Sequence, residues 1–142
     1  MRLVKHLLEA KPRVVHAIAP EQPVLEAIRM MADKYVGALL VMRGDELVGI
    51  VSERDYARKV ILKGKSSADT PIRDIMSSPV LSVGPGDSAH RCMRMMTEQR
   101  IRHLAVVENG KVLGVVSIGD LVKAVIDEQA EQLEQLQRYI VG

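Results

Sequence analysis

The sequence contains no phenylalanine and no tryptophan, and three tyrosines supply its only phenol rings. Proteins that bind single-stranded nucleic acid stack bases on aromatic side chains, so this class is disfavoured. A single cysteine, Cys92, excludes a disulfide framework and a cysteine-rich zinc site. It lies on the apolar side of a predicted helix, where we expect it to be buried and unreactive. The four histidines lack the spacing of metal ligands, so we expect no metal site.

An excess of charge of one sign is also lacking, because 20 Lys and Arg residues face 18 Asp and Glu residues. This balance argues against nucleic acid or an anionic membrane as the main partner. No apolar run is long enough to cross a bilayer. The first residues do not resemble a signal peptide, since Lys5, His6 and Glu9 interrupt their apolar stretch. We therefore expect a cytoplasmic protein without a membrane or nucleic-acid partner.

What the chain does contain is an internal duplication with an offset of 65 residues. Self-similarity at a fixed period indicates a repeat architecture. Identical residues at this offset include Val15 and Val80, Arg29 and Arg94, Leu39 and Leu104, Gly49 and Gly114, Ser52 and Ser117, and Asp55 and Asp120. One copy of about 60 residues is marginal alone, so we expect the two copies to pack together.

Both copies predict the same order of elements: strand, helix, strand, strand, helix. In the first copy the predicted strands are 14–18, 38–42 and 47–51, one helix is opened by Pro23 with Val24, Ile28 and Met31 on one face, and a second helix covers 55–62. In the second copy the predicted segments are 80–83, 88–98, 104–107, 112–116 and 120–126. Asn109-Gly110 between two apolar runs is a strong hairpin signal. Short lead-in helices are expected at 4–8 and 71–76. The predicted domains are a first repeat at 1–62, a linker at 63–70, a second repeat at 71–126 and a C-terminal helix at 127–142.

Each predicted hairpin ends in Gly-x-x-Ser-x-x-Asp, at Gly49 to Asp55 and again at Gly114 to Asp120. Ser and Asp are favoured helix N-caps, so capping alone explains part of the motif. A second interpretation is a nucleoside site. A carboxylate can accept hydrogen bonds from both ribose hydroxyls, Ser and the free N–H groups of the helix can bind phosphate, and Gly lets backbone approach a ligand closely.

With its repeat order and its two Gly-x-x-Ser-x-x-Asp endings, the chain resembles the CBS domain family over about residues 1–126. The resemblance implies an α/β fold in which two tandem repeats pack sheet to sheet with pseudo-two-fold symmetry, followed by the C-terminal helix. Two such repeats form a pair that, in this family, binds adenosine-containing ligands such as AMP, ATP, NAD or S-adenosylmethionine in the cleft between the copies. Many members carry Pro in the first hairpin strand, where this chain has Leu40 and Ala105.

The resemblance also implies two sets of ligand-binding residues. The first site would comprise Ile50, Ser52, Arg54, Asp55, Pro79, Val80, Leu81, Ile101, Arg102 and His103. The second would comprise Val14, Val15, His16, Val36, Gly37, Ala38, Val115, Ser117 and Asp120. In each site the Asp would hold the ribose, apolar residues would sandwich adenine, and the remaining segment would face the phosphate. No residue is predicted to be catalytic.

The two sites differ where phosphate is expected, because Arg102-His103 of one copy replaces Gly37-Ala38 of the other. Charge-assisted hydrogen bonds to phosphate are strong, so the Asp55 site should prefer a phosphorylated ligand. An ordinary surface arginine is the alternative for Arg102. The basic stretch from Arg54 to Lys65 is either a solvated helix face or a contact for a second phosphate through Arg58 or Lys59.

Residues 127–141 are rich in Glu and Gln and carry Leu133, Leu136 and Ile140 on one stripe. Such a helix either folds back on its own domain or docks against a second chain. The resemblance implies a non-enzymatic sensor that binds AMP, NAD or ATP without an obligatory cofactor, forms a disc-like homodimer and signals to a client protein. The alternative is a ligand-independent homodimeric interaction module that recruits its partner through the C-terminal helix.

Overall fold

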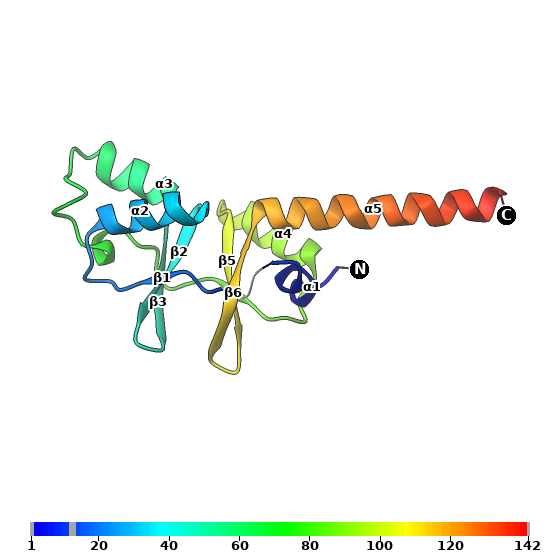
Figure 1. Ribbon diagram of the computed structural model, residues 1–142, viewed down its shortest axis with the longest axis horizontal. Coiled ribbons are helices and arrows are strands. Elements are labelled where there is room, and N and C mark those ends of the chain that lie inside the picture. Colours follow the sequence, from blue (N-terminus) through cyan, green and yellow to red (C-terminus); the bar gives the residue numbers. More distant parts are fainter. Residues whose placement is uncertain (1, 12–13, 142) are drawn as a thin grey trace. The chain divides into compact units, whose positions relative to one another are not determined.

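The computed structural model describes residues 2–11 and 14–141, and its contacts divide the chain into two compact units. The first-repeat unit comprises Val15–Leu81, and the second-repeat unit comprises the residues up to Val14 together with those from Ser82 onward. The outermost predicted boundaries, residues 1 and 142, lie outside the described residues. Each unit contains one three-stranded sheet with helices (Figure 1), so the predicted α/β fold class and the two repeats are confirmed.

In the first-repeat unit, strands β1, β2 and β3 form the sheet in that order, with β1 parallel to β2 and β2 antiparallel to β3. The elements are β1 (Ala17–Ile18), α2 (Val24–Lys34), β2 (Ala38–Arg43), β3 (Glu46–Ser52), α3 (Glu53–Tyr56), the π-helix η1 (Ala57–Ile61) and the 3-10 helix η2 (Ile72–Asp74). Apolar residues of α2 and the strands form the core with Val60, Ile72 and Ile75.

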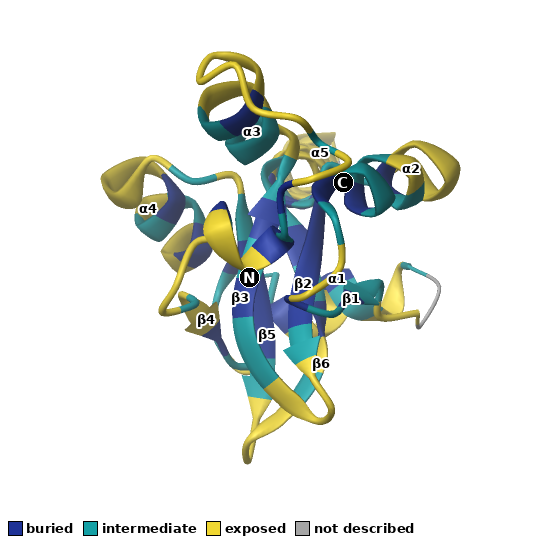
Figure 2. Cartoon of the chain, turned by 90° about the vertical axis from the view of Figure 1, so that its left-hand side faces the viewer, coloured by how far each residue is buried: buried dark blue, intermediate teal, exposed yellow. Residues whose placement is uncertain are grey.

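The second-repeat unit has the same topology, with sheet order β4-β5-β6. Its elements are α1 (Val4–Glu9), β4 (Ser82–Val83), α4 (Ala89–Gln99), β5 (His103–Glu108), β6 (Lys111–Ser117) and α5 (Ile118–Val141). The middle of β5 is buried and the second half of β6 alternates between buried and half-buried residues, whereas the hairpin tip is exposed (Figure 2). Cys92 is fully buried in this core, as predicted, and Met96 is buried beside it.

The duplication extends to backbone irregularities that no periodicity reveals. Helices α2 and α4 end at Tyr35 and Arg100, both left-handed at φ 55° and related by the repeat offset. Both hairpins also shift register at equivalent positions, after Val41 and after Val106. These matched departures show that the two copies share one backbone design.

Each lead-in segment packs in the unit of the other repeat. Helix α1 precedes the first repeat but packs in the second-repeat unit, and η2 precedes the second repeat but packs in the first-repeat unit. Val4 and Leu7 of α1 are buried in the core of the second-repeat unit, and Ile72 of η2 is buried in the first. The backbone contacts are equivalent: Val4 N donates to Asp87 O at 2.8 Å, and Ile72 N donates to Gln22 O at 2.9 Å. Apolar segments dock where a hairpin offers a complementary face, whatever their sequence order.

Two helices also differ in extent from the prediction. The helix expected at 55–62 begins at Glu53 and widens into the π-helix η1 from Ala57. The helices expected at 120–126 and 127–142 are one continuous element, α5. The change of composition after Ile126 therefore marks the point where one helix leaves its core and becomes exposed, and not a break between two elements.

The lead-in segments explain the glycine of the repeated motif. A Cβ atom on Gly49 would lie 2.5 Å from the Met76 sulfur, and one on Gly114 would lie 3.0 Å from a methyl carbon of Leu8. Met76 follows η2 and Leu8 lies on α1, so both glycines face a lead-in segment. Close approach of a neighbouring segment therefore gives a second reason for these glycines, and close approach to a ligand stays a prediction.

We predict that Gly49→Ala destabilises the protein by about 1–2 kcal/mol, because three successive Met76 atoms must move to relieve overpacking. Gly114→Ala is the matched control. It meets only the end of the flexible Leu8 side chain, and alanine lowers the entropy of the unfolded chain. It should therefore cost less than Gly49→Ala or be neutral. Urea unfolding of both variants measures the difference, and equal losses would contradict this explanation.

Candidate functional site

The Ser and Asp residues of each motif bond to one another where a strand becomes a helix. In the first-repeat unit, Asp55 Oδ2 accepts from Ser52 N and Ser52 Oγ, both at 3.0 Å, while Asp55 N donates to Ser52 Oγ at 3.2 Å. In the second, Asp120 Oδ2 accepts from Ser117 N at 2.8 Å and Asp120 N donates to Ser117 Oγ at 3.1 Å. These are capping boxes with aspartate in the third position. The capping role of the motif is therefore confirmed.

Each of these half-buried carboxylates also carries a lysine ammonium. Lys59 Nζ lies 3.1 Å from Asp55 Oδ1 and donates to the Ile75 carbonyl at 2.8 Å. Lys11 Nζ lies 2.5 Å from Asp120 Oδ2 and donates to the Val115 carbonyl at 2.9 Å. Because Lys59 is one helical turn beyond its aspartate and Lys11 follows α1, the same charge pairing is reached from two different elements.

Most residues of the first predicted site lie in the first-repeat unit, around the end of β3. Ile50 exchanges backbone hydrogen bonds with Ser77 at 3.1 and 2.9 Å. This pairing holds the start of the segment that contains Pro79, Val80 and Leu81 beside the strand that leads to Ser52. The remaining residues of that site, Ile101, Arg102 and His103, belong to the second-repeat unit, so their assignment to Asp55 stays a prediction.

The second predicted site is divided in the same way. Val14, Val115, Ser117 and Asp120 belong to the second-repeat unit, and Val15, His16, Val36, Gly37 and Ala38 belong to the first. Within its own unit, each segment that is predicted to face phosphate lies beside a capping box. Glu53 N donates to Gly37 O at 3.1 Å, and Ile118 N donates to Arg102 O at 2.9 Å. Ala38 pairs with Ser52, and His103 pairs with Ser117.

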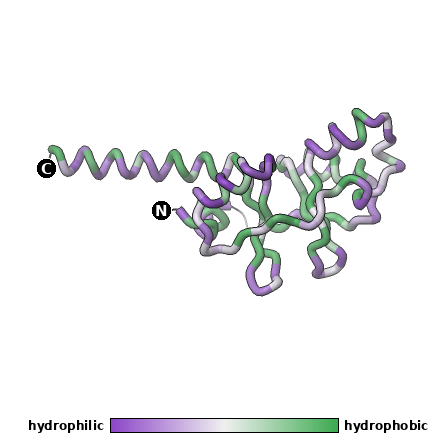
Figure 3. Tube along the Cα trace, turned by 180° about the vertical axis from the view of Figure 1, so that it is seen from behind, coloured by the Kyte–Doolittle hydropathy of each residue, from purple (hydrophilic) through white to green (hydrophobic). Residues whose placement is uncertain are grey.

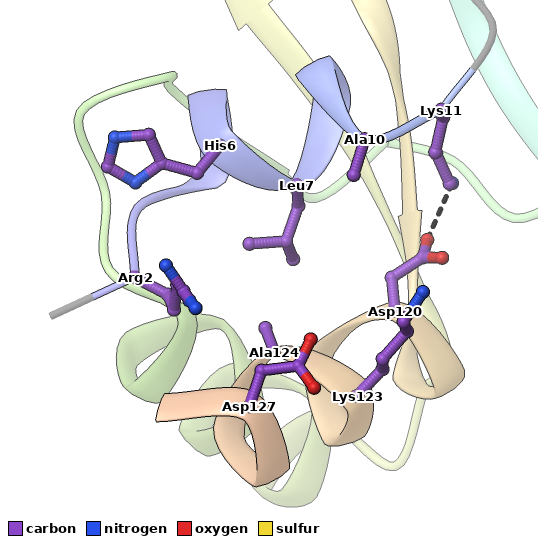
Figure 4. A pocket seen from close by; sticks show the side chains of 9 residues that line it. All are labelled: Arg2, His6, Leu7, Ala10, Lys11, Asp120, Lys123, Ala124 and Asp127. Atoms are coloured by element: carbon purple, nitrogen blue, oxygen red, sulfur yellow. Dashed lines mark ion pairs between the residues drawn. The ribbon is translucent and has the colours of Figure 1, made fainter. Parts of the chain in front are cut away.

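A pocket of about 280 Å³ lies between α1 and α5 in the second-repeat unit, and Asp120 is one of its lining residues (Figure 4). Four basic residues line it: Arg2, His6, Lys11 and Lys123. Figure 4 shows the Lys11 side chain directed at the Asp120 carboxylate. Arg2 also forms an ion pair with Glu131 of α5. The pocket thus combines two carboxylates, Asp120 of the repeated motif and Asp127, with the cationic side chains of Arg2, Lys11 and Lys123.

Sequence reasoning missed the basic residues of this pocket. Lys11 carries no motif, and it reaches Asp120 only because α1 packs against the second copy. Lys59 was recognised as one of several basic residues near Asp55, and its spacing of four residues was the signal for the ion pair. No comparable signal connects Lys11 with a carboxylate 109 positions later.

His103 lies in the same electrostatic environment as Asp120. Burial lowers the pKa of His103, the positive charges of Lys11 and Arg102 lower it further, and the carboxylate of Asp120 opposes them. The imidazole is therefore neutral at neutral pH. This changes the sequence-based interpretation, in which Arg102 and His103 together offered two cationic or donor groups. Arg102 supplies the charge, and His103 supplies hydrogen-bonding capacity without charge.

The lowered pKa of His103 predicts that stability falls as the pH drops below about 6.5, the ordinary histidine value. In that range the unfolded chain binds a proton that the folded chain does not, so unfolding is favoured. His103→Gln should make the free energy of unfolding less dependent on pH in this range. One histidine can contribute at most about 1.4 kcal/mol per pH unit to that dependence. Urea unfolding at pH 7.5, 6.5 and 5.5 measures it, with His16→Gln as a control for loss of an imidazole. An unchanged slope in His103→Gln would refute the prediction.

Comparison with known proteins connects this geometry to a family. The model of the CBS domain matches residues 6–62 and again residues 72–127. A mitochondrial CBS domain-containing protein of Arabidopsis thaliana, CBSX3, is 42% identical over 127 residues, which cover 86% of this chain and 62% of that protein. The chain thus spans less than two thirds of the length of this relative.

Solved structures show the same fold. A signal-transduction protein with CBS domains from Burkholderia ambifaria is 48% identical, with a TM-score of 0.86 over 89% of this chain and 96% of that chain. The CBS domain protein PAE2072 from Pyrobaculum aerophilum, complexed with AMP, is 28% identical, with a TM-score of 0.77 over 91% of this chain and 98% of that chain. From the two family matches, the repeated topology and the duplicated motif, we conclude that the chain belongs to the CBS domain family as a tandem pair.

Proposed function

We propose that this CBS pair is a regulatory module that binds an adenine nucleotide, with AMP, NAD and ATP as the candidates. The observation that carries the proposal is the duplicated, half-buried aspartate held by a serine at the junction of strand and helix. The AMP complex of the 28% identical protein from Pyrobaculum aerophilum supports this ligand class. The proposal assigns the first site to Asp55 and the second to Asp120.

The carboxylates have the hydrogen-bonding capacity that a ribose requires. A carboxylate offers about four lone-pair positions, and each cap uses only part of them. Both bonds of Asp120 described above use Oδ2, so Oδ1 is the oxygen we assign to the ribose hydroxyls. Asp55 differs, because Lys59 contacts Oδ1 while the cap occupies Oδ2. A ribose at Asp55 therefore shares Oδ1 with Lys59 or displaces its ammonium.

The lysines also remove an electrostatic obstacle. A half-buried bare carboxylate would repel the phosphate of a nucleotide bound beside it, and like charges in a poorly solvated site are costly. Lys59 and Lys11 neutralise Asp55 and Asp120 locally. The pocket beside Asp120 adds Lys123 to these lysines. Its ammonium could pair with a phosphate at the Asp120 site, where Gly37-Ala38 supplies no charged side chain.

Exposed apolar side chains offer surfaces for the adenine ring. Three apolar side chains in the segments assigned to adenine are exposed: Val14 at 60%, Val15 at 41% and Leu81 at 39%. Burying such side chains against a flat base removes apolar surface from water, which favours binding. This contact requires no aromatic residue, in agreement with a sequence that lacks Phe and Trp.

We propose a non-enzymatic, cytoplasmic homodimer that passes the signal to a client protein. Burial raises the pKa of the Cys92 thiol, which makes it unsuited to act as a nucleophile. No helix among residues 2–11 and 14–141 is both long and apolar enough to span a membrane. A nucleotide would act by binding one conformation or assembly more tightly than another.

The alternative function is an interaction module that binds no nucleotide and recruits its partner through the C-terminal helix. The exposed apolar residues of α5, such as Leu133 and Leu136, favour it. Calorimetry with AMP, ATP, NAD and S-adenosylmethionine separates the two functions. Binding of at least one ligand supports the sensor, whereas the absence of heat and of thermal stabilisation with all four supports the interaction module.

We predict that Asp55→Ala and Asp120→Ala each weaken AMP binding at one site at least tenfold. Hydrogen bonds to a charged group contribute about 1.5–3 kcal/mol, which is the basis of that estimate. Loss of the cap should cost the ligand-free protein about 1 kcal/mol, a fall of a few degrees in Tm. Calorimetric titration with AMP and a thermal melt measure the two effects.

The matched control for these variants is Asp45→Ala, which removes an exposed carboxylate from a hairpin turn. It should leave AMP affinity unchanged. If Asp55→Ala and Asp120→Ala unfold the ligand-free protein, the motif serves the fold alone. If they remain folded and bind AMP with unchanged affinity, the carboxylates do not contact the ribose.

We predict that Arg102→Ala weakens AMP binding about tenfold or more and changes adenosine binding less than twofold. The guanidinium can form charge-assisted hydrogen bonds only with the phosphate, which adenosine lacks. Parallel titrations with both ligands provide the comparison. Lys111→Ala, at an exposed cation of the hairpin, is the control for a change of net charge. Equal losses for AMP and adenosine would show that Arg102 has no role in binding phosphate.

A further inference from the structure

Helix α5 carries an exposed apolar stripe with the spacing of a coiled-coil seam. Successive members are four, three, four, three and four residues apart: Val122, Ile126, Gln129, Leu133, Leu136 and Ile140. A period of 3.5 residues keeps such a stripe facing a parallel neighbouring helix, with these residues at the a and d positions of heptads. We call this set the seam of α5. The tube in Figure 3 shows hydrophobic residues recurring along the whole of this helix.

The seam is open to solvent. Its apolar members Ile126, Leu133, Leu136 and Ile140 are 58%, 60%, 56% and 75% exposed. The part of α5 that packs on its own unit uses another face, where Leu121 and Ala124 are buried. The sequence-based alternative, in which the helix folds back on its own domain, therefore holds only for the first turns of α5.

The outer half of α5 extends past the core of its unit (Figure 1). Every residue from 129 to 141 is exposed. An isolated helical segment of about 13 residues is marginal in water, because nucleation is costly and no packing stabilises it. Two ion pairs support this segment on its polar side, Arg2 with Glu131 and Arg138 with Glu134. The apolar side needs a partner.

The flanks of the seam point to the identity of that partner. From residue 125 onward, the positions beside the seam hold only uncharged residues, which are Val125, Ala130, Gln132, Gln137 and Tyr139. The charged residues Asp127, Glu128, Glu131, Glu134 and Arg138 fall at the outward positions of the heptad. An identical helix therefore meets no repulsion across the seam, and a charged partner finds no complementary flank that would select it.

We propose that α5 pairs with α5 of a second copy of this chain as a parallel, in-register, two-stranded coiled coil. The a positions hold Ile126, Leu133 and Ile140, and the d positions hold Val122, Gln129 and Leu136. β-branched residues at a with Leu at d favour two strands. The inference does not depend on nucleotide binding, and it specifies the surface of the homodimer included in the proposed function.

Gln129 fixes the orientation and the register. In a parallel, in-register pair the two Gln129 amides face one another and hydrogen-bond across the seam. An antiparallel or shifted arrangement places each amide against an apolar side chain, where an unpaired polar group is costly. A single polar residue in a seam is a known means of specifying register at some loss of stability.

The size of the seam predicts a concentration-dependent dimer. Each helix contributes five apolar side chains to the seam, and each side chain can bury on the order of 100 Å². The dimer then buries on the order of 1,000 Å² in total, which is the lower limit for specific interfaces. We therefore expect dissociation in the micromolar range and a smaller α-helical content in the dissociated monomer.

The test compares two neighbouring substitutions that add the same charge to the full-length protein. Leu136→Glu places a carboxylate in the seam, and Gln135→Glu places one at an outward position of the same helix. We expect Leu136→Glu to weaken dimerisation at least tenfold in sedimentation equilibrium, and Gln135→Glu to change it less than twofold. Leu136 is 56% exposed, so the core should remain folded. AMP affinity, measured at a concentration where the unsubstituted protein is also monomeric, should be unchanged in both variants.

A second measurement tests orientation. Nitroxide labels on Val141→Cys, in a Cys92→Ala background, should lie close together, because the axes of a parallel pair are about 8–10 Å apart. Long distances, which would place the two labels at opposite ends of the coiled coil, would overturn the parallel arrangement. A monomer at all concentrations, a trimer, or a dimer insensitive to Leu136→Glu would overturn the coiled coil. In the last case the homodimer would form through another surface. An unsubstituted protein that dimerises through this seam but binds none of the tested nucleotides would count against the nucleotide proposal alone.

Discussion

The reciprocal hydrogen bonds between Ser and Asp fix the point where each hairpin strand becomes a helix. Ser52 with Asp55, and Ser117 with Asp120, satisfy backbone N–H groups that would otherwise be left at a half-buried helix start. The carboxyl group of each aspartate then lies in a partly buried place, where a charged group needs a partner. A lysine meets that requirement in both units. Fold and candidate chemistry thus originate in the same two side chains.

The two copies meet this requirement differently, and the difference is informative. The position equivalent to Lys59 is Ala124 in the second copy, so that position offers no ammonium. Lys11, which follows α1, takes the place of Lys59 and reaches Asp120 from another element. Both copies therefore have a lysine–aspartate ion pair, but the lysine comes from a different position in the sequence. The half-buried carboxylate requires a nearby cation, and a lysine at any position that can reach it meets this requirement.

Local signals in the sequence predicted much of the fold. The offset of 65 residues, the alternation of apolar strands and the Asn109-Gly110 turn are all short-range features, and the hairpins and helix starts follow from them. The capping pairs were predictable for the same reason, because Ser and Asp are only three residues apart. The exchange of α1 and η2 was not predictable, since both segments are apolar and the sequence does not state which hairpin each covers. Lys11 and the close approach of Met76 to Gly49 depend on that exchange and could not be predicted without it.

Helix α5 connects the capping aspartate of the second repeat with the exposed seam. Its first turn contains the capping aspartate Asp120, and its last turns contain the exposed seam, with no break in the 24 residues between Ile118 and Val141. A ligand can shift an assembly equilibrium only through a difference in affinity between the two states. A continuous helix provides such a difference mechanically, because an ordered first turn lowers the cost of ordering the turns that follow. Occupancy at Asp120 and pairing at Leu136 would then favour one another, and by linkage each would strengthen the other by the same factor.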